Sequence, residues 1–255
     1  MRVLQQPAYV LINRPYSETS WIVEVFTRDY GRFSVMAKGA RRLKSKLRGS
    51  LIAFQPLLIS WIGKGELPTL TDAEIDRSEF SFIENQLCGD ALVCGFYCNE
   101  LIMKLLHRHD RHQSLFVSYH RTLMSLSRAQ KRRDTSRVLR EFEQSVIAES
   151  GYAVDFNRQA DQGEKIDANG LYRFYAGRGF IAQTRPDSYT ISGRIVLALS
   201  EQPPNDLSAQ EDSQARDLMR LILTSTMNRG DIISRSLFFP RAASALETPL
   251  VPKNV

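Results

Sequence analysis

The sequence predicts an α+β protein in which a small closed β-barrel precedes a mainly helical domain that carries an irregular β-hairpin insert. The first 75 or so residues contain five short segments rich in β-branched and aromatic residues, each bounded by turn residues. From residue 86 onward, apolar residues recur at spacings of three and four, which is typical of helices packed on one side. The length of 255 residues fits two ordinary domains.

The expected strands alternate with turn signals along the first domain. The second and third strands flank Arg28–Gly31, where Gly31 can take the positive φ that a hairpin loop with a bulge requires. In the third strand Phe33 and Val35 alternate with Ser34, so that one face can be buried. The fourth is expected to be long, with a kink at Pro56. The expected ranges are Val3–Ile12, Ser20–Thr27, Arg32–Lys38, Leu51–Ile62 and Leu67–Ile75.

Three helices are expected next. Gln86–Leu106 carries an apolar stripe that includes Cys94 and Cys98, and Ser114–Ser127 continues the helical pattern. The third helix is expected over Thr135–Ser150. Its boundaries are predicted by Asp134 as N-cap and by Gly151 as the residue that ends it.

The remaining elements are less regular. Aromatic residues alternate around two glycines in Leu171–Gln183, which predicts a hairpin, and helices are expected over Ile191–Leu199 and Gln214–Met227. A loop is expected at Pro203-Pro204. The predicted division is a barrel domain over residues 1–80, a helical domain over 81–242 with an insert at about 151–190, and a frayed, disordered tail over 243–255.

Positive charge is concentrated in the first quarter of the chain. Residues 1–60 hold ten Lys or Arg against three Asp or Glu, whereas the rest holds 24 against 25, so the net charge of +6 arises in the first segment. Its densest part is Gly39–Gly49, hereafter the basic loop, which contains no acidic residue. Its cations are Arg41, Arg42, Lys44, Lys46 and Arg48. A field of this kind attracts nucleic acid through phosphate neutralisation, although a solvated loop without a ligand is the alternative.

Four aromatic residues lie near these cations in the sequence. Tyr16, Trp21, Tyr30 and Phe33 could stack on bases, but we expect most of them in the barrel core.

A second basic run lies at residues 128–140. On a helix Arg133, Arg137 and Arg140 share one face, which would suit an acidic peptide or a phosphate backbone. The alternative is an ordinary solvated face with an Arg137–Glu141 ion pair, and the sequence leaves both open.

Signatures of enzymes are absent from the sequence. It contains no phosphate-binding loop, dinucleotide fingerprint, H-E-x-x-H or G-x-S-x-G motif, so we expect no enzymatic activity, catalytic residue or cofactor. The acidic pairs Asp72 with Glu74 and Glu141 with Glu143 are interpreted as solvated surface carboxylates.

Cys88, Cys94 and Cys98 precede His107, His109 and His112, and thiolates with imidazoles can form a zinc site. The spacing favours buried core cysteines and surface histidines near a helix end, and no metal is expected. The odd number of cysteines, the missing signal peptide and the absence of an apolar run of ~18 residues predict a cytoplasmic protein that does not enter the membrane.

Several motifs in order resemble the RecO family of bacterial recombination mediators, strongly to about residue 75 and more weakly over nearly the whole chain. The strong matches are Val10–Ser20, Val25–Thr27 with Gly31 and Arg32, Ala37–Arg42 with Lys44 and Ser45, and Phe54–Leu57. The weaker ones are Tyr97–Leu101, Arg140–Glu143, Gly151-Tyr152 and Ser234-Arg235.

This resemblance implies an OB-fold barrel followed by a helical domain. It also implies binding of single- and double-stranded DNA, annealing of complementary strands, and action with RecR to help RecA replace single-strand binding protein (SSB), with the RecA filament as an indirect partner. Such a protein would work at the nucleoid during repair.

The resemblance also assigns roles to residues. The family's basic segment matches the basic loop and its neighbours, so the predicted DNA-binding residues are Lys38, Arg41, Arg42, Lys44, Lys46, Arg48 and Arg32. Arg140, together with Arg137 and Arg133, matches the region that receives the acidic C-terminal tail of SSB. Many members hold zinc with four cysteines in the insert, but residues 151–183 contain no cysteine, which predicts a zinc-free member.

Two other functions are compatible with the same basic residues. An RNA-directed OB-fold module would show the same basic barrel. An adaptor that recognises acidic protein tails would use the same basic surfaces with incidental DNA contact.

Overall fold

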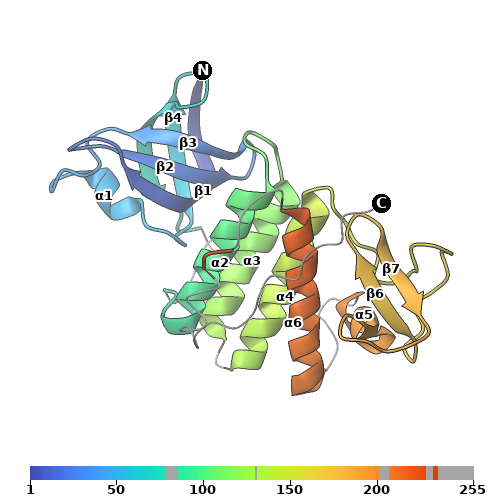
Figure 1. Cartoon of the computed structure of the whole chain (residues 1–255). Helices are drawn as coiled ribbons and strands as arrows, with labels where there is room; N and C mark the ends of the chain where they lie inside the picture. The colour runs from blue at the N-terminus through green and yellow to red at the C-terminus, as the bar shows by residue number, and fades with distance from the viewer. Residues whose placement is uncertain (79–85, 130, 201–206, 228–231, 235–255) are drawn as a thin grey trace.

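The N-terminal part of the chain folds as a closed five-stranded barrel with the order β1-β2-β3-β5-β4. The computed structural model describes residues 1–78, 86–129, 131–200, 207–227 and 232–234 (Figure 1). The strands are β1 (Arg2–Pro15), β2 (Trp21–Thr27), β3 (Gly31–Ala37), β4 (Leu57–Ile62) and β5 (Thr69–Ile75). All neighbours are antiparallel except β3 and β5, which meet in parallel at Met36 and Thr69 and close the barrel. The predicted closed barrel, OB-like in form, is thereby confirmed.

The β2–β3 hairpin forms where the sequence predicts it. Gly31 has a φ of +66°, which a side chain would disfavour, and the Thr27 hydroxyl donates to the Gly31 carbonyl at 2.8 Å. Val23, Val25, Phe33 and Val35 of the two strands are buried in the barrel core. Alternation of apolar and polar residues therefore set the register of this hairpin.

The expected long strand over Leu51–Ile62 is wrong in its first half. The basic loop ends in a short helix, α1 (Lys46–Ser50), and β4 begins only after Pro56. Between them Phe54 has a φ of +68° and lies against Gly95, where a Cβ would stand 2.8 Å from the Phe54 ring. Tertiary packing of this ring on the next domain accounts for the irregular backbone.

The helical domain is built from four long helices, with α4 in contact with α2, α3 and α6. They are α2 (Gly89–Leu105), α3 (Gln113–Arg128), α4 (Arg132–Glu149) and α6 (Ala209–Thr226). The expected N-cap at Asp134 is wrong, because α4 begins after Lys131 and has no side-chain cap. Gly151, with a φ of +83°, follows the end of α4 as predicted. α6 begins five residues earlier than expected, at a capping box formed by Ser208 and Glu211.

A small sheet and one helix lie beside this bundle. β6 (Leu171–Tyr175) and β7 (Gly179–Gln183) form the predicted hairpin, and β8 (Ile191–Ser192) pairs with β6. α5 (Gly193–Ser200) follows directly, so the expected helix begins two residues late. Pro203-Pro204 and the tail over 243–255 lie outside the described residues.

The barrel and the helical domain share a continuous apolar core. Tyr9, Leu11 and Phe26 of the barrel belong to the same buried cluster as the helices, and the Tyr9 ring meets Tyr119 edge-on at 5.0 Å. The Asn99 side chain of α2 donates to the Leu11 carbonyl at 2.9 Å. Packing of this kind fixes the orientation of the barrel on the helices. None of the helices in the described ranges is long and apolar enough to span a membrane.

Candidate nucleic-acid interface

The basic loop is held to the barrel by its apolar residues. Ala40 and Leu51 are buried in the barrel core, and Leu47 packs against it from α1. Gly39, with a φ of +69°, turns the chain away from β3. Because Ala40, Leu47 and Leu51 point inward, the charged residues between them face solvent.

Arg41 ties the basic loop to the neighbouring loop between β1 and β2. Its backbone N–H donates to the Thr19 carbonyl at 2.9 Å, and its guanidinium donates to the Ser17 carbonyl. The Gly39 N–H also approaches the Ser20 hydroxyl at 3.4 Å. The two loops thus form one surface at this end of the barrel.

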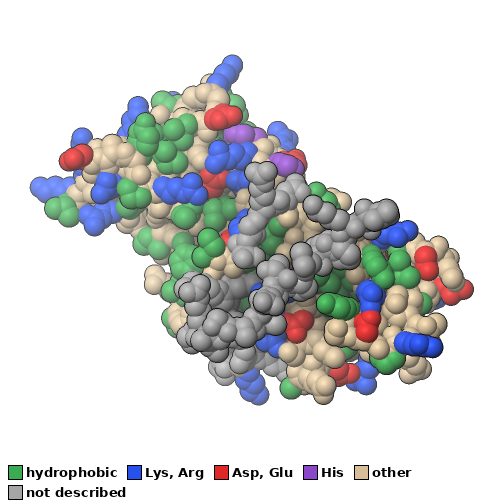
Figure 2. Space-filling model, viewed as in Figure 1, with side chains coloured by type: hydrophobic (Ala, Val, Ile, Leu, Met, Phe, Trp, Pro, Cys, Tyr) green, Lys and Arg blue, Asp and Glu red, His purple; other side chains and the backbone are tan. Residues whose placement is uncertain are grey.

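Six of the predicted DNA-binding residues lie together on that surface. All six side chains are exposed, and among the residues that the structure describes no carboxylate forms an ion pair with any of them. They are Lys38, Arg41, Arg42, Lys44, Lys46 and Arg48. Lys and Arg side chains gather over the end of the barrel that carries α1 (Figure 2). Uncompensated cations in such density suit a phosphate chain, whose bound counterions they can replace.

Arg32 lies apart from this surface. It is the second residue of β3 and does not follow the strand as the other six do, and its side chain is only 14% exposed. Its Nη1 contacts Glu24 Oε1 at 2.6 Å and its Nε donates to the Leu106 carbonyl at 2.9 Å. Arg32 therefore joins the barrel to the helical domain, and the structure does not bring it together with the other six cations.

Glu24 and Arg108, which the sequence did not single out, complete this junction. Arg108 Nη2 lies 3.1 Å from Glu24 Oε2, and the Ser34 hydroxyl donates to the same oxygen at 2.6 Å. The α2–α3 connection thereby docks on β3. No local signal marks these residues, because they lie 84 positions apart in the sequence.

The aromatic residues divide as expected. Phe33 is buried in the barrel core, while Tyr30 and Trp21 pack against that core. Tyr16 is exposed in the loop to which Arg41 is bonded. Tyr16 is therefore the one of these four aromatics with a largely exposed ring beside the loop cations.

The predicted Arg face of α4 is wrong at Arg140, its last member. Arg137 is exposed and lies 3.7 Å from Glu141, but Arg140 is 6% exposed and is ion-paired to Glu143. The reason is that helices α2, α3 and α6 surround α4 and leave little of it to solvent. The Arg133 side chain lies outside the described part of the chain.

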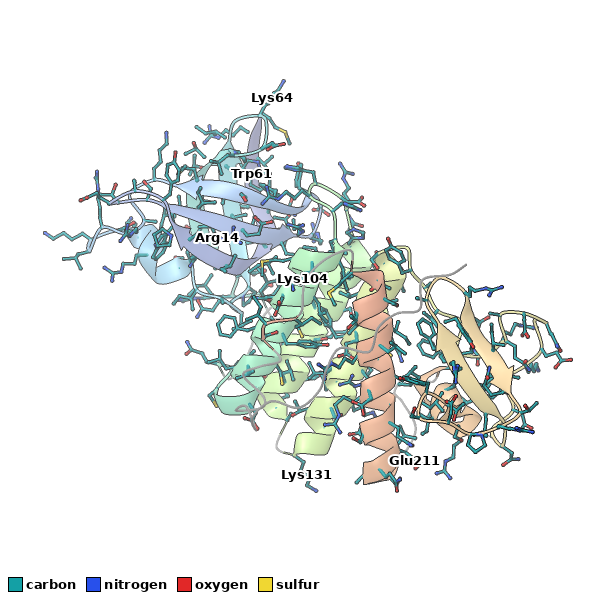
Figure 3. The ribbon with its side chains drawn as sticks, in the orientation of Figure 1. Arg14, Trp61, Lys64, Lys104, Lys131 and Glu211 are labelled. Carbon is teal, nitrogen blue, oxygen red and sulfur yellow. The ribbon has the colours of Figure 1, made fainter. Side chains whose placement is uncertain are left out.

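Glu143, expected at the surface, is buried as well. It accepts from the Tyr97 hydroxyl and from Arg140. Among the residues that the structure describes, none accepts a hydrogen bond from the Arg140 Nε. The spacing of three residues between Arg140 and Glu143 is the sequence signal that could have identified this pair. Figure 3 shows Lys131, just before α4, at the end of the bundle away from the barrel, so the two basic segments do not form one surface.

The cysteines and histidines lie in different environments. Cys94 and Cys98 are buried core residues, as predicted, and burial raises the pKa of Cys94 to about 12 and that of Cys98 well above its ordinary value. His112 departs from the expectation of a surface residue, since it is buried with its Nδ1 3.0 Å from Glu149. Within the described ranges no three His, Cys, Asp or Glu side chains group as metal ligands would.

A cavity of about 390 Å³ opens between α3, α4 and the insert. Leu115, Ile147 and Phe156 supply apolar walls, while Glu149 and Asp155 contribute carboxylates. No Lys or Arg is among its described lining residues, so their charge does not favour an acidic ligand.

Comparisons with known proteins cover nearly the whole chain. Residues 1–78 match the family model described as "Recombination protein O N terminal", and residues 88–230 match "Recombination protein O C terminal". The chain is 42% identical to the DNA repair protein RecO of Nitrosospira multiformis over 235 residues, which are 91% of this chain and 93% of the relative. It is 37% identical to that of Dechloromonas aromatica (93% and 96% covered) and 38% identical to that of Laribacter hongkongensis (95% and 96% covered).

Proposed function

The chain belongs to the RecO family of DNA repair proteins, and from this membership and the barrel surface we propose that it binds DNA through the basic loop. Its role lies in DNA repair and recombination, and the names of its relatives describe no catalytic activity. The observation that carries the proposal is the set of six exposed cations without ion pairs among the described residues. Contact with phosphates at this surface would be largely independent of base sequence.

The finer proposal is a non-enzymatic mediator. The protein binds single- and double-stranded DNA in the cytoplasm, at the nucleoid, anneals complementary strands, and acts with RecR so that RecA replaces SSB on DNA. Support comes from the family membership and from the position of the cations, which leaves them open to a long polyanion. Strand annealing on SSB-coated DNA, measured with and without RecR, tests activity and partners together; annealing no faster than without the protein would refute the proposal.

Removal of charge tests the DNA surface directly. Because Arg41 also anchors the loop, the variant that changes charge with least effect on structure is Arg42, Lys44, Lys46 and Arg48→Ala. Loss of four phosphate contacts should reduce the magnitude of the negative slope of log K against log salt by about 3. The matched control replaces four exposed cations elsewhere, namely Arg121, Lys165, Arg178 and Arg185. Equal slopes for the two variants would exclude the basic loop as the main phosphate contact.

Competition between DNA and RNA of equal length separates this proposal from an RNA-directed module. We expect DNA to displace bound DNA at least as well as RNA does. Preferential displacement by RNA would favour the alternative.

Partner binding by α4 is a second proposal, for which exposed Arg137 is the supporting observation. Arg137 can meet a carboxylate of the SSB tail directly, whereas Arg140 would have to leave Glu143. Arg137→Ala should therefore weaken binding of a tail peptide while the affinity for bare DNA stays constant. A parallel fall in both affinities would indicate a shared surface, and unchanged tail binding would remove Arg137 from the proposal.

A further inference from the structure

We propose that Leu43, at the tip of the basic loop, inserts between stacked bases of the DNA whose phosphates the loop cations hold. The inference rests on the proposed DNA interface and adds to it a contact with the bases themselves. It concerns a leucine whose side chain is 90% exposed between two cations.

The backbone presents Leu43 at a defined turn. The Ser45 N–H donates to the Arg42 carbonyl at 3.0 Å, which closes a four-residue turn with Leu43 in its second position. Preceding and following turns are closed by Arg42 N–H to the Gly39 carbonyl at 3.1 Å and by Arg48 N–H to the Ser45 carbonyl at 3.2 Å. Together with the Arg41 anchor, these bonds hold the tip away from the barrel.

Leu43 is the apolar residue that this loop leaves in solvent. Its side chain is 90% exposed, more than that of any other large hydrophobic residue in the described part of the chain. The loop's other apolar residues, Ala40 and Leu47, are buried or packed on the barrel core. A single exposed leucine is ordinary on a protein surface. Here, however, it stands directly between Arg42 and Lys44, both exposed.

The flanking charges indicate what Leu43 meets. A phosphate backbone bound by Arg42 and Lys44 would lie beside the Leu43 side chain, because these three residues are consecutive. Proteins that bind the minor groove of DNA frequently insert apolar side chains, leucine among them, between base steps, and the cost of unstacking is offset by the contacts made. Tyr16, exposed in the loop to which Arg41 is bonded, supplies a ring on which an unstacked base can rest.

The test uses DNA with 2-aminopurine, whose fluorescence rises when the base is unstacked. The full-length protein should raise this fluorescence on binding, and Leu43→Ala should reduce the rise roughly threefold or more, because an alanine is too short to separate a base step. Leu43→Met should retain most of the rise. The salt slope of Leu43→Ala should equal that of the unchanged protein, because the phosphate contacts remain.

Leu67→Ala is the matched control. Leu67 is an exposed leucine of the turn between β4 and β5, beside Lys64, which Figure 3 places at a different part of the barrel from α1. The rise in 2-aminopurine fluorescence with the Leu67→Ala variant should match that with the unchanged protein.

The outcomes separate this inference from the interface itself. Equal fluorescence rises for Leu43→Ala and Leu67→Ala, with DNA binding weakened in the four-cation variant, would overturn the role of Leu43 and leave the interface standing. A changed salt slope in Leu43→Ala would mean a rearranged loop and would likewise overturn the inference. If the four-cation variant binds DNA fully, the interface is wrong, and the fluorescence of Leu43→Ala alone then decides whether Leu43 touches bases.

Discussion

The basic loop of the barrel and helix α4 each carry several cationic side chains, but the two segments place these charges in different environments. In the basic loop one side packs on the barrel, so the six cations at and beside it stay in solvent. In α4, neighbouring helices cover most of the surface, and Arg140 is paired with buried Glu143. A run of positive charge therefore predicts a ligand surface only where packing leaves the charged side chains exposed to solvent.

The largest expected effect tests whether Arg140 is a structural charge. Glu143→Ala leaves the buried guanidinium without its carboxylate, and we expect the free energy of unfolding to fall by about 4 kcal/mol in urea denaturation. Glu141→Ala, which removes a partly exposed partner of Arg137, is the control and should cost about 0.5 kcal/mol or less. An equal loss of unfolding free energy in the two variants would mean that Arg140, like the loop cations, contributes little to stability.

A second prediction concerns the junction of the barrel with the helical domain, formed by Glu24, Arg32 and Arg108. Its charges are less buried than the Arg140–Glu143 pair but less exposed than those of the basic loop. Glu24→Ala should lower the free energy of unfolding by about 3 kcal/mol, because Arg32 is left largely buried without a carboxylate. Arg108, which is half exposed, should account for little of this loss, so Arg108→Ala serves as the control. A cost for Glu24→Ala no greater than that for Arg108→Ala would contradict the structural role of Arg32.

The third prediction uses pH to test a carboxylate of the helical domain. Burial raises the pKa of Glu100, but hydrogen bonds from the Ser234 hydroxyl and N–H, the Ile233 N–H and Lys104 outweigh it and hold the pKa below its ordinary value. A lowered folded-state pKa gives stability that is present above the ordinary glutamate pKa and is lost as pH falls through the folded value.

Glu100→Gln should therefore lower the free energy of unfolding by about 1 kcal/mol at pH 7 and by less at pH 3. Urea denaturation at the two pH values measures the difference. A cost that is the same at both would show that the charge on Glu100 does not contribute.

The smallest expected effect returns to the basic loop. Replacement of Arg42, Lys44, Lys46 and Arg48 by Ala should change the free energy of unfolding by no more than about 0.5 kcal/mol, since exposed side chains without ion pairs contribute little to folding. The same variant should bind DNA more weakly and with a smaller salt dependence. A large loss of stability would show that these charges serve the fold rather than a ligand.

Local sequence predicted most elements but not all their ends. Gly31 and the alternating residues around it predicted the β2–β3 hairpin, because a positive φ and a two-residue period are local properties. Asp134 is a favoured cap residue and therefore predicts the wrong start for α4. The helix begins at Arg132 without a side-chain cap. Phe54 was placed in a strand because its contact with Gly95 of α2 is not local.

Periodicity, turn residues and charge are properties of the chain read in order, and they predicted the barrel, the helical domain and the location of the basic loop. Which cations remain available depends on contacts between distant segments. Arg32 and Arg140 are bonded to Glu24 and Glu143, while Lys38 and the cations of the basic loop are open to solvent. Burial differs between them because it depends on how many neighbouring elements cover a residue, and those neighbours come from distant parts of the sequence.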